Sequence, residues 1–131
     1  MIILNLKLNN IYGFTNFSID FSYPKKIINS LLEDEFLEGR PNFRYKRAVI
    51  LMGANATGKT SLGKVLLNIV NFINSGDPSF LNLLALSDRI ASFQIDFVNN
   101  GYMLHRLNGD LTESENGNVT NVRYFCTEIL K

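Results

Sequence analysis

Apolar and polar residues alternate in two short runs near the start of the chain, residues 4–8 and 17–21. A period of two is that of a strand with one buried face. Gly13 lies between the runs and is free to adopt the positive φ of a tight turn. The sequence therefore predicts an antiparallel hairpin over residues 1–22, with a scaffolding role. Its apolar positions are Leu4, Leu6, Leu8, Phe17, Ile19 and Phe21.

The same alternation returns in the last third of the chain, where Phe93, Ile95 and Phe97 share one face. The Asn-Asn-Gly sequence that follows is a strong signal for a hairpin turn. Polar residues and glycine further along indicate two more interruptions of the chain. The predicted elements are a strand over 92–97, a hairpin turn at 99–101, a return strand over 102–107, a turn at 108–110, a loop over 112–118 and a last strand over 119–129.

A period of about 3.6 residues marks the predicted helices. The main helix covers residues 61–73 and ends at a turn over residues 74–78. A second short helix is predicted over residues 79–86. Residues 27–37 also show helical spacing with acidic residues around it, which is typical of a short solvated helix. The apolar face of the main helix consists of Leu62, Val65, Leu66, Ile69, Phe72 and Ile73.

An uninterrupted apolar run precedes the main helix. Residues 48–52 read Ala-Val-Ile-Leu-Met, which is typical of a strand buried on both faces. Residues 53–60 then read Gly-Ala-Asn-Ala-Thr-Gly-Lys-Thr and satisfy the pattern G-x-x-x-x-G-K-[ST] at every fixed position. A strand, a glycine-rich loop and a helix in this order are the context that a phosphate-binding P-loop requires.

The residues of this loop suit a nucleoside triphosphate with Mg²⁺. Successive backbone N–H groups at a helix N-terminus attract an anion, and glycine lets the backbone approach it closely. We expect Lys59 to neutralise the β- and γ-phosphates as the catalytic cation, and Thr60 to ligate Mg²⁺ through Oγ1. ATP and Mg²⁺ are therefore the predicted cofactors. The predicted nucleotide-binding residues are Gly53, Ala54, Asn55, Ala56, Thr57, Gly58, Lys59, Thr60 and Ser61.

The composition is that of an ordinary globular domain. The chain has 131 residues, 46% hydrophobic and 19% charged, with a net charge of +1, so no overall field attracts nucleic acid or an acidic membrane. Cys126 is the only cysteine and His105 the only histidine. A single cysteine forms no internal disulfide, which favours a reducing cytoplasm. His105 lies in a strand pattern and is interpreted as structural. The sequence shows no signal peptide or membrane span.

A basic stretch with interleaved aromatic residues leads into the apolar run. Such a mixture is found where nucleic acid binds by phosphate pairing and base stacking, and an aromatic residue here would also suit a position beside an adenine ring. A solvated connection is the preferred interpretation. The residues in question are Arg40, Phe43, Arg44, Tyr45, Lys46 and Arg47.

The opening strand and turn (residues 4–14), the strand at 17–21 and the loop at 53–61 carry a family resemblance. The chain resembles the ABC-type ATPase heads of the SMC, RecF and OLD-like group, and especially the bacterial AAA family ATPases found with phage-defence systems. Asn55 and Ser61 are typical of the loop in that group, and the late strands resemble its β-subdomain.

The resemblance implies an α/β P-loop NTPase fold, with the P-loop strand and helix packed against an antiparallel β-subdomain. Residues 1–131 would be the N-terminal part of an incomplete head. Its implied divisions are a β-hairpin (1–22), a helical and basic connection (23–47), the P-loop strand and helix (48–74) and a short helix with antiparallel strands (75–131).

The sequence lacks three features of such heads: a Walker B strand after the loop, a signature motif and a His-switch. Gln94, the only glutamine, lies in a strand pattern and is a poor Q-loop residue. We therefore expect this chain to bind ATP with little turnover. The complete protein would dimerise around two nucleotides, hydrolyse ATP and act on an effector or nucleic acid. The alternative is a small module that uses nucleotide only as a ligand, or not at all, and acts by protein association.

Overall fold

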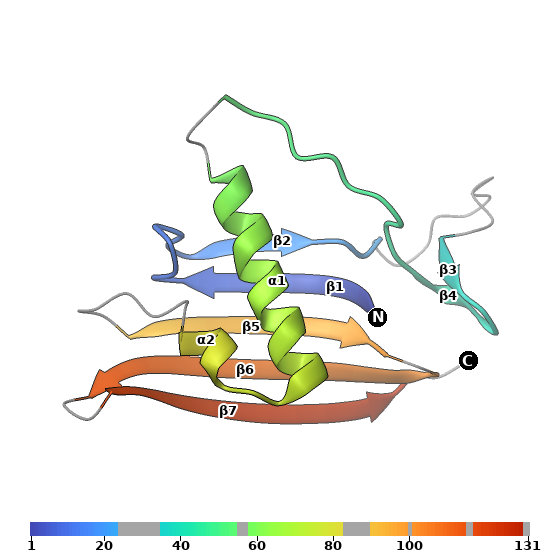
Figure 1. Ribbon diagram of the computed structural model, residues 1–131. Helices are drawn as coiled ribbons and strands as arrows, with labels where there is room; N and C mark the ends of the chain where they lie inside the picture. Colours follow the sequence, from blue (N-terminus) through green and yellow to red (C-terminus); the bar gives the residue numbers. More distant parts are fainter. Residues whose placement is uncertain (24–34, 55–57, 83–89, 100, 115–116, 130–131) are drawn as a thin grey trace.

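The computed structural model describes residues 1–23, 35–54, 58–82, 90–99, 101–114 and 117–129. Its centre is a five-stranded sheet with the order β2-β1-β5-β6-β7, and one face of this sheet is covered by the helix α1 (Figure 1). Every neighbouring pair of strands is antiparallel. The strands are β1 (Ile2–Asn9), β2 (Phe17–Asp20), β5 (Ala91–Val98), β6 (Met103–Ser114) and β7 (Gly117–Glu128).

Helix α1 (Lys59–Ser75) confirms the main predicted helix. Its buried residues Leu62, Val65 and Ile69 belong to the same core as Leu6 and Ile95 of the sheet. Each fully buried aliphatic side chain of this kind stabilises the fold by about 1.5–3 kcal/mol, so the buried face of α1 holds the helix against the sheet. The core contains Leu6, Leu8, Ile11, Leu62, Val65, Ile69, Leu81, Ala91, Phe93, Ile95, Phe97, Leu107 and Leu111.

The second predicted helix is confirmed where the structure describes it. Helix α2 spans Ser79–Asn82 and buries Leu81 completely, while the rest of the predicted segment, residues 83–86, lies outside the described residues. None of the helices in the described part of the chain is long and apolar enough to cross a membrane.

The N-terminal hairpin is also confirmed. Strands β1 and β2 pair with Leu6 opposite Ile19 and Leu8 opposite Phe17. The turn between them includes Gly13 at a φ of 81°. The alternation that predicted the hairpin corresponds to burial: Leu4, Leu6 and Leu8 are buried, whereas the residues between them lie on the other face or at the surface.

The hairpin of β5 with β6 is confirmed, but the predicted turn at residues 108–110 is wrong. Strand β6 continues through these residues and pairs with β5 and β7 on its two sides. Gly109 lies opposite Phe93, and a Cβ at this position would overlap the Phe93 ring. The glycine therefore provides space for an aromatic core residue in a strand rather than the freedom of a turn.

The predicted loop over residues 112–118 is wrong as well. Strand β6 extends to Ser114 and β7 begins at Gly117, with Ser114 paired to Gly117. The last pair between β5 and β6 is Ala91 with Leu111, so beyond that point β6 and β7 form a two-stranded ribbon. The sequence of this ribbon is mostly polar and contains Gly117, a composition that is also typical of a loop. The last strand was correctly predicted.

A small separate hairpin replaces the predicted solvated connection. Strands β3 (Phe36–Leu37) and β4 (Arg40–Arg44) form a two-stranded sheet. The helix predicted over 27–37 is thus wrong at its C-terminal end, and residues 27–34 lie outside the described residues. Phe43 and Tyr45 pack against a second small core of Leu4, Val98 and Ile129.

The buried strand predicted over residues 48–52 is wrong for this chain. These residues belong to no strand, and Figure 1 shows them in an extended arm that leads from β4 to the N-terminus of α1. Val49, Ile50, Leu51 and Met52 are 42%, 83%, 44% and 87% exposed. A strand buried on both faces is typical of a parallel sheet with both faces covered, and the described residues contain only antiparallel pairs. The parallel part of the expected sheet is therefore absent from the described structure.

Candidate functional site

The N-terminus of α1 is built around Gly58. This residue has a φ of 91°, in the left-handed region, and Lys59 is the first helical residue. The N–H of Leu62 donates to the carbonyl of Gly58 over 2.8 Å, so the first turn closes directly on the glycine. Among the described side chains none caps this end. The first N–H groups of a helix point out along its axis, where the helix dipole favours an anion.

Lys59 connects the two ends of the loop. Its ammonium donates to the carbonyl oxygens of Gly53 at 2.5 Å and of Ala54 at 2.8 Å. The chain therefore bends back so that the first two loop residues lie beside the first helical residue.

The remaining predicted loop residues divide into two groups. Thr60 is exposed and Ser61 is half-buried, at the start of the same helix. The middle of the loop, Asn55, Ala56 and Thr57, lies outside the described residues.

A contact that the sequence did not predict supports the loop from the N-terminal hairpin. The ring of Phe14 lies against Gly58, with its Cζ 3.2 Å from the position that a Cβ at residue 58 would occupy. Phe14 in turn lies beside Phe17, with ring centroids 4.7 Å apart. The only signal in the sequence was an aromatic residue next to Gly13 in the first turn, and nothing connected it with a loop more than forty residues later.

The basic stretch does not form one continuous surface. Arg40 is buried, its Nε donates to the carbonyl of Ile129 over 2.8 Å, and its guanidinium lies 3.7 Å from the centroid of the Tyr102 ring. Lys46 instead donates to the carbonyl of Asp20 over 3.3 Å. Arg40 therefore has a structural role. Of the four basic residues of this stretch, only Arg44, Lys46 and Arg47 are left as candidates for contact with nucleic acid.

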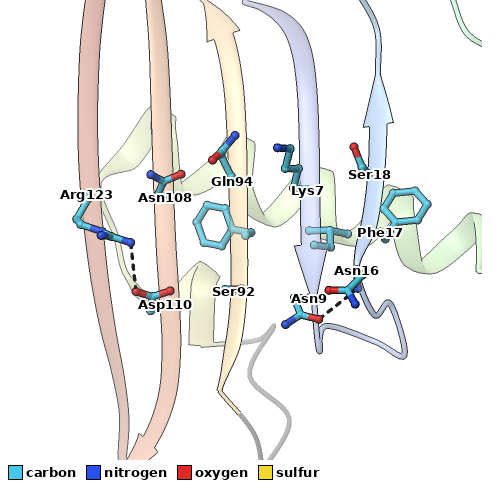
Figure 2. A pocket seen from close by; sticks show the side chains of 12 residues that line it. Lys7, Asn9, Asn16, Phe17, Ser18, Ser92, Gln94, Asn108, Asp110 and Arg123 are labelled. Atoms are coloured by element: carbon cyan, nitrogen blue, oxygen red, sulfur yellow. Dashed lines mark hydrogen bonds and ion pairs between the residues drawn. The ribbon is translucent and has the colours of Figure 1, made fainter.

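A polar row crosses the other face of the five-stranded sheet. Strand pairing places Ser18, Lys7, Gln94, Asn108 and Arg123 side by side, one from each strand. Figure 2 shows their side chains on the face that turns away from α1. They line a shallow hollow of about 430 Å³. This hollow is therefore on the other side of the sheet from α1, and Gln94 does not approach the described residues of the loop at residues 53–61.

Charges in the hollow partly compensate one another. Arg123 lies 3.7 Å from Asp110. On the neighbouring row, Arg106 forms two hydrogen bonds with the carboxylate of Asp96, at 2.7 and 2.8 Å. Because each arginine faces an aspartate, this surface has little excess positive charge for a polyanion.

His105 lies within a row of rings. Its ring stacks on Phe97 with centroids 5.0 Å apart and on Tyr124 with centroids 5.8 Å apart. Nδ1 of His105 lies 2.6 Å from Oη of Tyr124. The histidine thus joins β5, β6 and β7 and is distant from the loop in the sheet order.

Comparison with protein-family models, with curated proteins and with solved structures found no match to this chain.

Proposed function

We propose that the chain binds Mg·ATP through residues 53–61, as the N-terminal part of an ABC-type P-loop ATPase head. The complete protein would hydrolyse ATP and transmit the change to an effector or to nucleic acid, as in phage defence. The proposal comes from the sequence motif and the family resemblance, and the geometry of the described loop residues supports it.

One observation carries the proposal: Lys59 is the first residue of α1 and its ammonium bridges back to the carbonyls of Gly53 and Ala54. The cation therefore lies at the N-terminus of a helix, next to the exposed residue Thr60. A polyphosphate needs a cation and N–H donors, and Mg²⁺ needs a hard oxygen ligand. The same region offers all three.

Nucleotide binding would change the hydrogen-bond partners of the Lys59 ammonium group. The ammonium group is a hydrogen-bond donor only, and in this structure its partners include the carbonyl oxygens of Gly53 and Ala54. A phosphate oxygen is a charged acceptor, and hydrogen bonds between charged groups are about twice as strong as neutral ones. The β- and γ-phosphates would therefore replace a carbonyl partner, with Mg²⁺ held by Thr60 on their other side.

Hydrolysis needs more than these groups. Charge neutralisation by Lys59 and Mg²⁺ lowers the barrier only when another group orients the attacking water. The sequence offers no Walker B acid after the loop. We therefore expect residues 1–131 to bind ATP with little turnover.

Calorimetric titration with Mg·ATP tests the proposal. A hydrogen bond to a charged group contributes about 1.5–3 kcal/mol, so Lys59→Ala should weaken binding by roughly 10- to 150-fold. Lys64→Ala is the matched control, because Lys64 is an exposed lysine further along α1 and should leave affinity unchanged. Wild-type protein that releases no heat with Mg·ATP, or equal affinity in both variants, would refute the proposal.

The alternative is a module that acts by protein association without nucleotide. The exposed apolar arm at residues 49–52 favours it, because large exposed apolar patches mark interaction sites. Absence of nucleotide binding in the wild type, together with a stable complex with another protein, would favour this alternative.

A further inference from the structure

Strand β7 is the longest unpaired edge of the sheet. It is the last strand in the order and pairs with β6 over twelve consecutive residues without a register shift. Within the described residues, no strand lies on its outer side. The opposite edge, β2, has only four residues. An open edge presents a row of unpaired backbone N–H and C=O groups that another strand can pair with.

Several of the usual protections of an edge strand are missing from β7, which has only Arg123 and Glu128 as charged residues. Proteins blunt their edges with proline, lysine, bulges or short strands, and the sequence of β7 contains neither proline nor lysine. Its Arg123 faces Asp110 of β6. Tyr124 and Phe125 are 56% and 55% exposed, and because they are consecutive, they lie on opposite faces of the sheet.

We propose that β7 pairs with β7 of a second copy of this chain, antiparallel and around a two-fold axis at Tyr124. The proposal does not depend on nucleotide binding. An edge strand is complementary to an antiparallel copy of itself, since each copy offers the donors and acceptors that the other lacks. The pairing would join the two five-stranded sheets into one continuous sheet.

The side chains favour this register over the two adjacent ones. With the axis at Tyr124, the two Tyr124 residues face each other, and Arg123 of each copy lies opposite Phe125 of the other. Aromatic pairs and pairs of an aromatic with a cation are favourable across strands. An axis at Arg123 would place two like charges opposite each other, which is unfavourable. An axis at Phe125 would shorten the paired segment and leave Arg123 opposite Thr127.

The interface is a single strand pair, which belongs to the small and transient class. Covalent trapping therefore suits it better than a shift in elution volume alone. Directly opposite Cα atoms of an antiparallel pair are about 4.5–5.5 Å apart, within the range of a disulfide. Cys126 of one copy would lie about 14 Å along the strands from Cys126 of the other, far outside that range.

The test is oxidative cross-linking of the full chain, followed by non-reducing electrophoresis. Tyr124→Cys combined with Cys126→Ser should form a covalent dimer rapidly, whereas the wild type, with Cys126 alone, should not. Adding Phe125→Lys, which places a charge on the edge, should reduce the dimer at least tenfold. Leu67→Lys is the matched control, because Leu67 is 61% exposed on α1, away from β7, and it should leave the yield unchanged.

Three results would overturn the proposal. The first is an equal yield of dimer through Cys126 of the wild type, which means another register or random collision. The second is a dimer that persists with Phe125→Lys while circular dichroism shows a folded protein. The third is that the variant with Tyr124→Cys and Cys126→Ser forms no covalent dimer, and that light scattering gives the mass of a monomer for the wild type at all concentrations. If Phe125→Lys fails to fold, the contrast between positions 124 and 126 still decides.

Discussion

Replacing Gly58 by alanine tests the link between the fold and the loop. Gly58 has a φ of 91°, a conformation that costs an L-residue about 1–2 kcal/mol. A Cβ there would also lie 3.2 Å from Cζ of Phe14, so the ring would have to move slightly. We expect Gly58→Ala to lower the free energy of unfolding by about 1–2 kcal/mol and to weaken Mg·ATP binding.

Gly63 provides the matched control within the same helix. It lies inside α1, and a Cβ there meets no atom within 4 Å. Alanine stabilises such a helical position by about 0.5–1 kcal/mol relative to glycine. Both substitutions replace glycine by alanine. Opposite changes in the free energy of unfolding would therefore be due to the backbone conformation at Gly58 and its surroundings.

Urea denaturation followed by circular dichroism measures both changes. Phe14→Ala in the Gly58→Ala background separates the two causes, since it removes the ring contact and leaves the strain. If Gly58→Ala is as stable as the wild type and binds nucleotide equally well, the left-handed conformation of residue 58 does not constrain the start of α1.

Two further substitutions test other parts of the fold. The Ser22 hydroxyl donates to the Asp20 carboxylate and lowers the pKa of Asp20, so this bond stabilises the protein above the unfolded pKa of the carboxyl group and is lost as pH falls through the folded one. Ser22→Ala should raise the pKa of Asp20, measured by NMR titration, and weaken this part of the acid dependence. Arg40→Ala should cost about 2–4 kcal/mol in urea denaturation, since it leaves a buried carbonyl unpaired and removes the cation from the Tyr102 ring. The control Arg44→Ala, at a less buried position, should change stability by less than about 0.5 kcal/mol, and equal effects would contradict the structural role of Arg40.

Sequence periodicity correctly predicted the elements in which apolar positions recur at the regular spacing of a strand or a helix. The N-terminal hairpin, α1 and β5 each direct one apolar face or stripe toward the core, where its residues are buried or half-buried, so their patterns are regular. Gly109 shows where local rules fail. The Asn-Gly-Asp sequence around it has the composition of a turn, yet the glycine is determined by the ring of Phe93 on the neighbouring strand. A contact between residues distant in sequence leaves no local signal.

The start of α1 lies within two residues of its predicted position at residue 61, whereas the surroundings of the loop were only partly predictable. The fixed spacing of the motif located Gly58 and Lys59 at the start of a helix, and α1 begins there. The contact of Phe14 with Gly58 depends on how the first turn folds over the helix, which no short motif contains. The buried strand over 48–52 failed for a different reason: its composition indicates burial, but burial requires neighbouring strands, and the described residues provide none for it.

The loop has a C-terminal arm, which is the start of α1, and an N-terminal arm, residues 48–54. The two arms are held in place to different degrees. The C-terminal arm is rigid, because Lys59 continues into a helix whose Leu62, Val65 and Ile69 are buried. The N-terminal arm, residues 48–54, is exposed along its length, and Lys59 holds its end through two carbonyl oxygens. A nucleotide that takes over the ammonium group must also keep this arm in place, and ordering exposed backbone costs about 1–2 kcal/mol per residue. Any neighbour that buries the apolar residues of the arm would remove this cost in advance and so strengthen nucleotide binding.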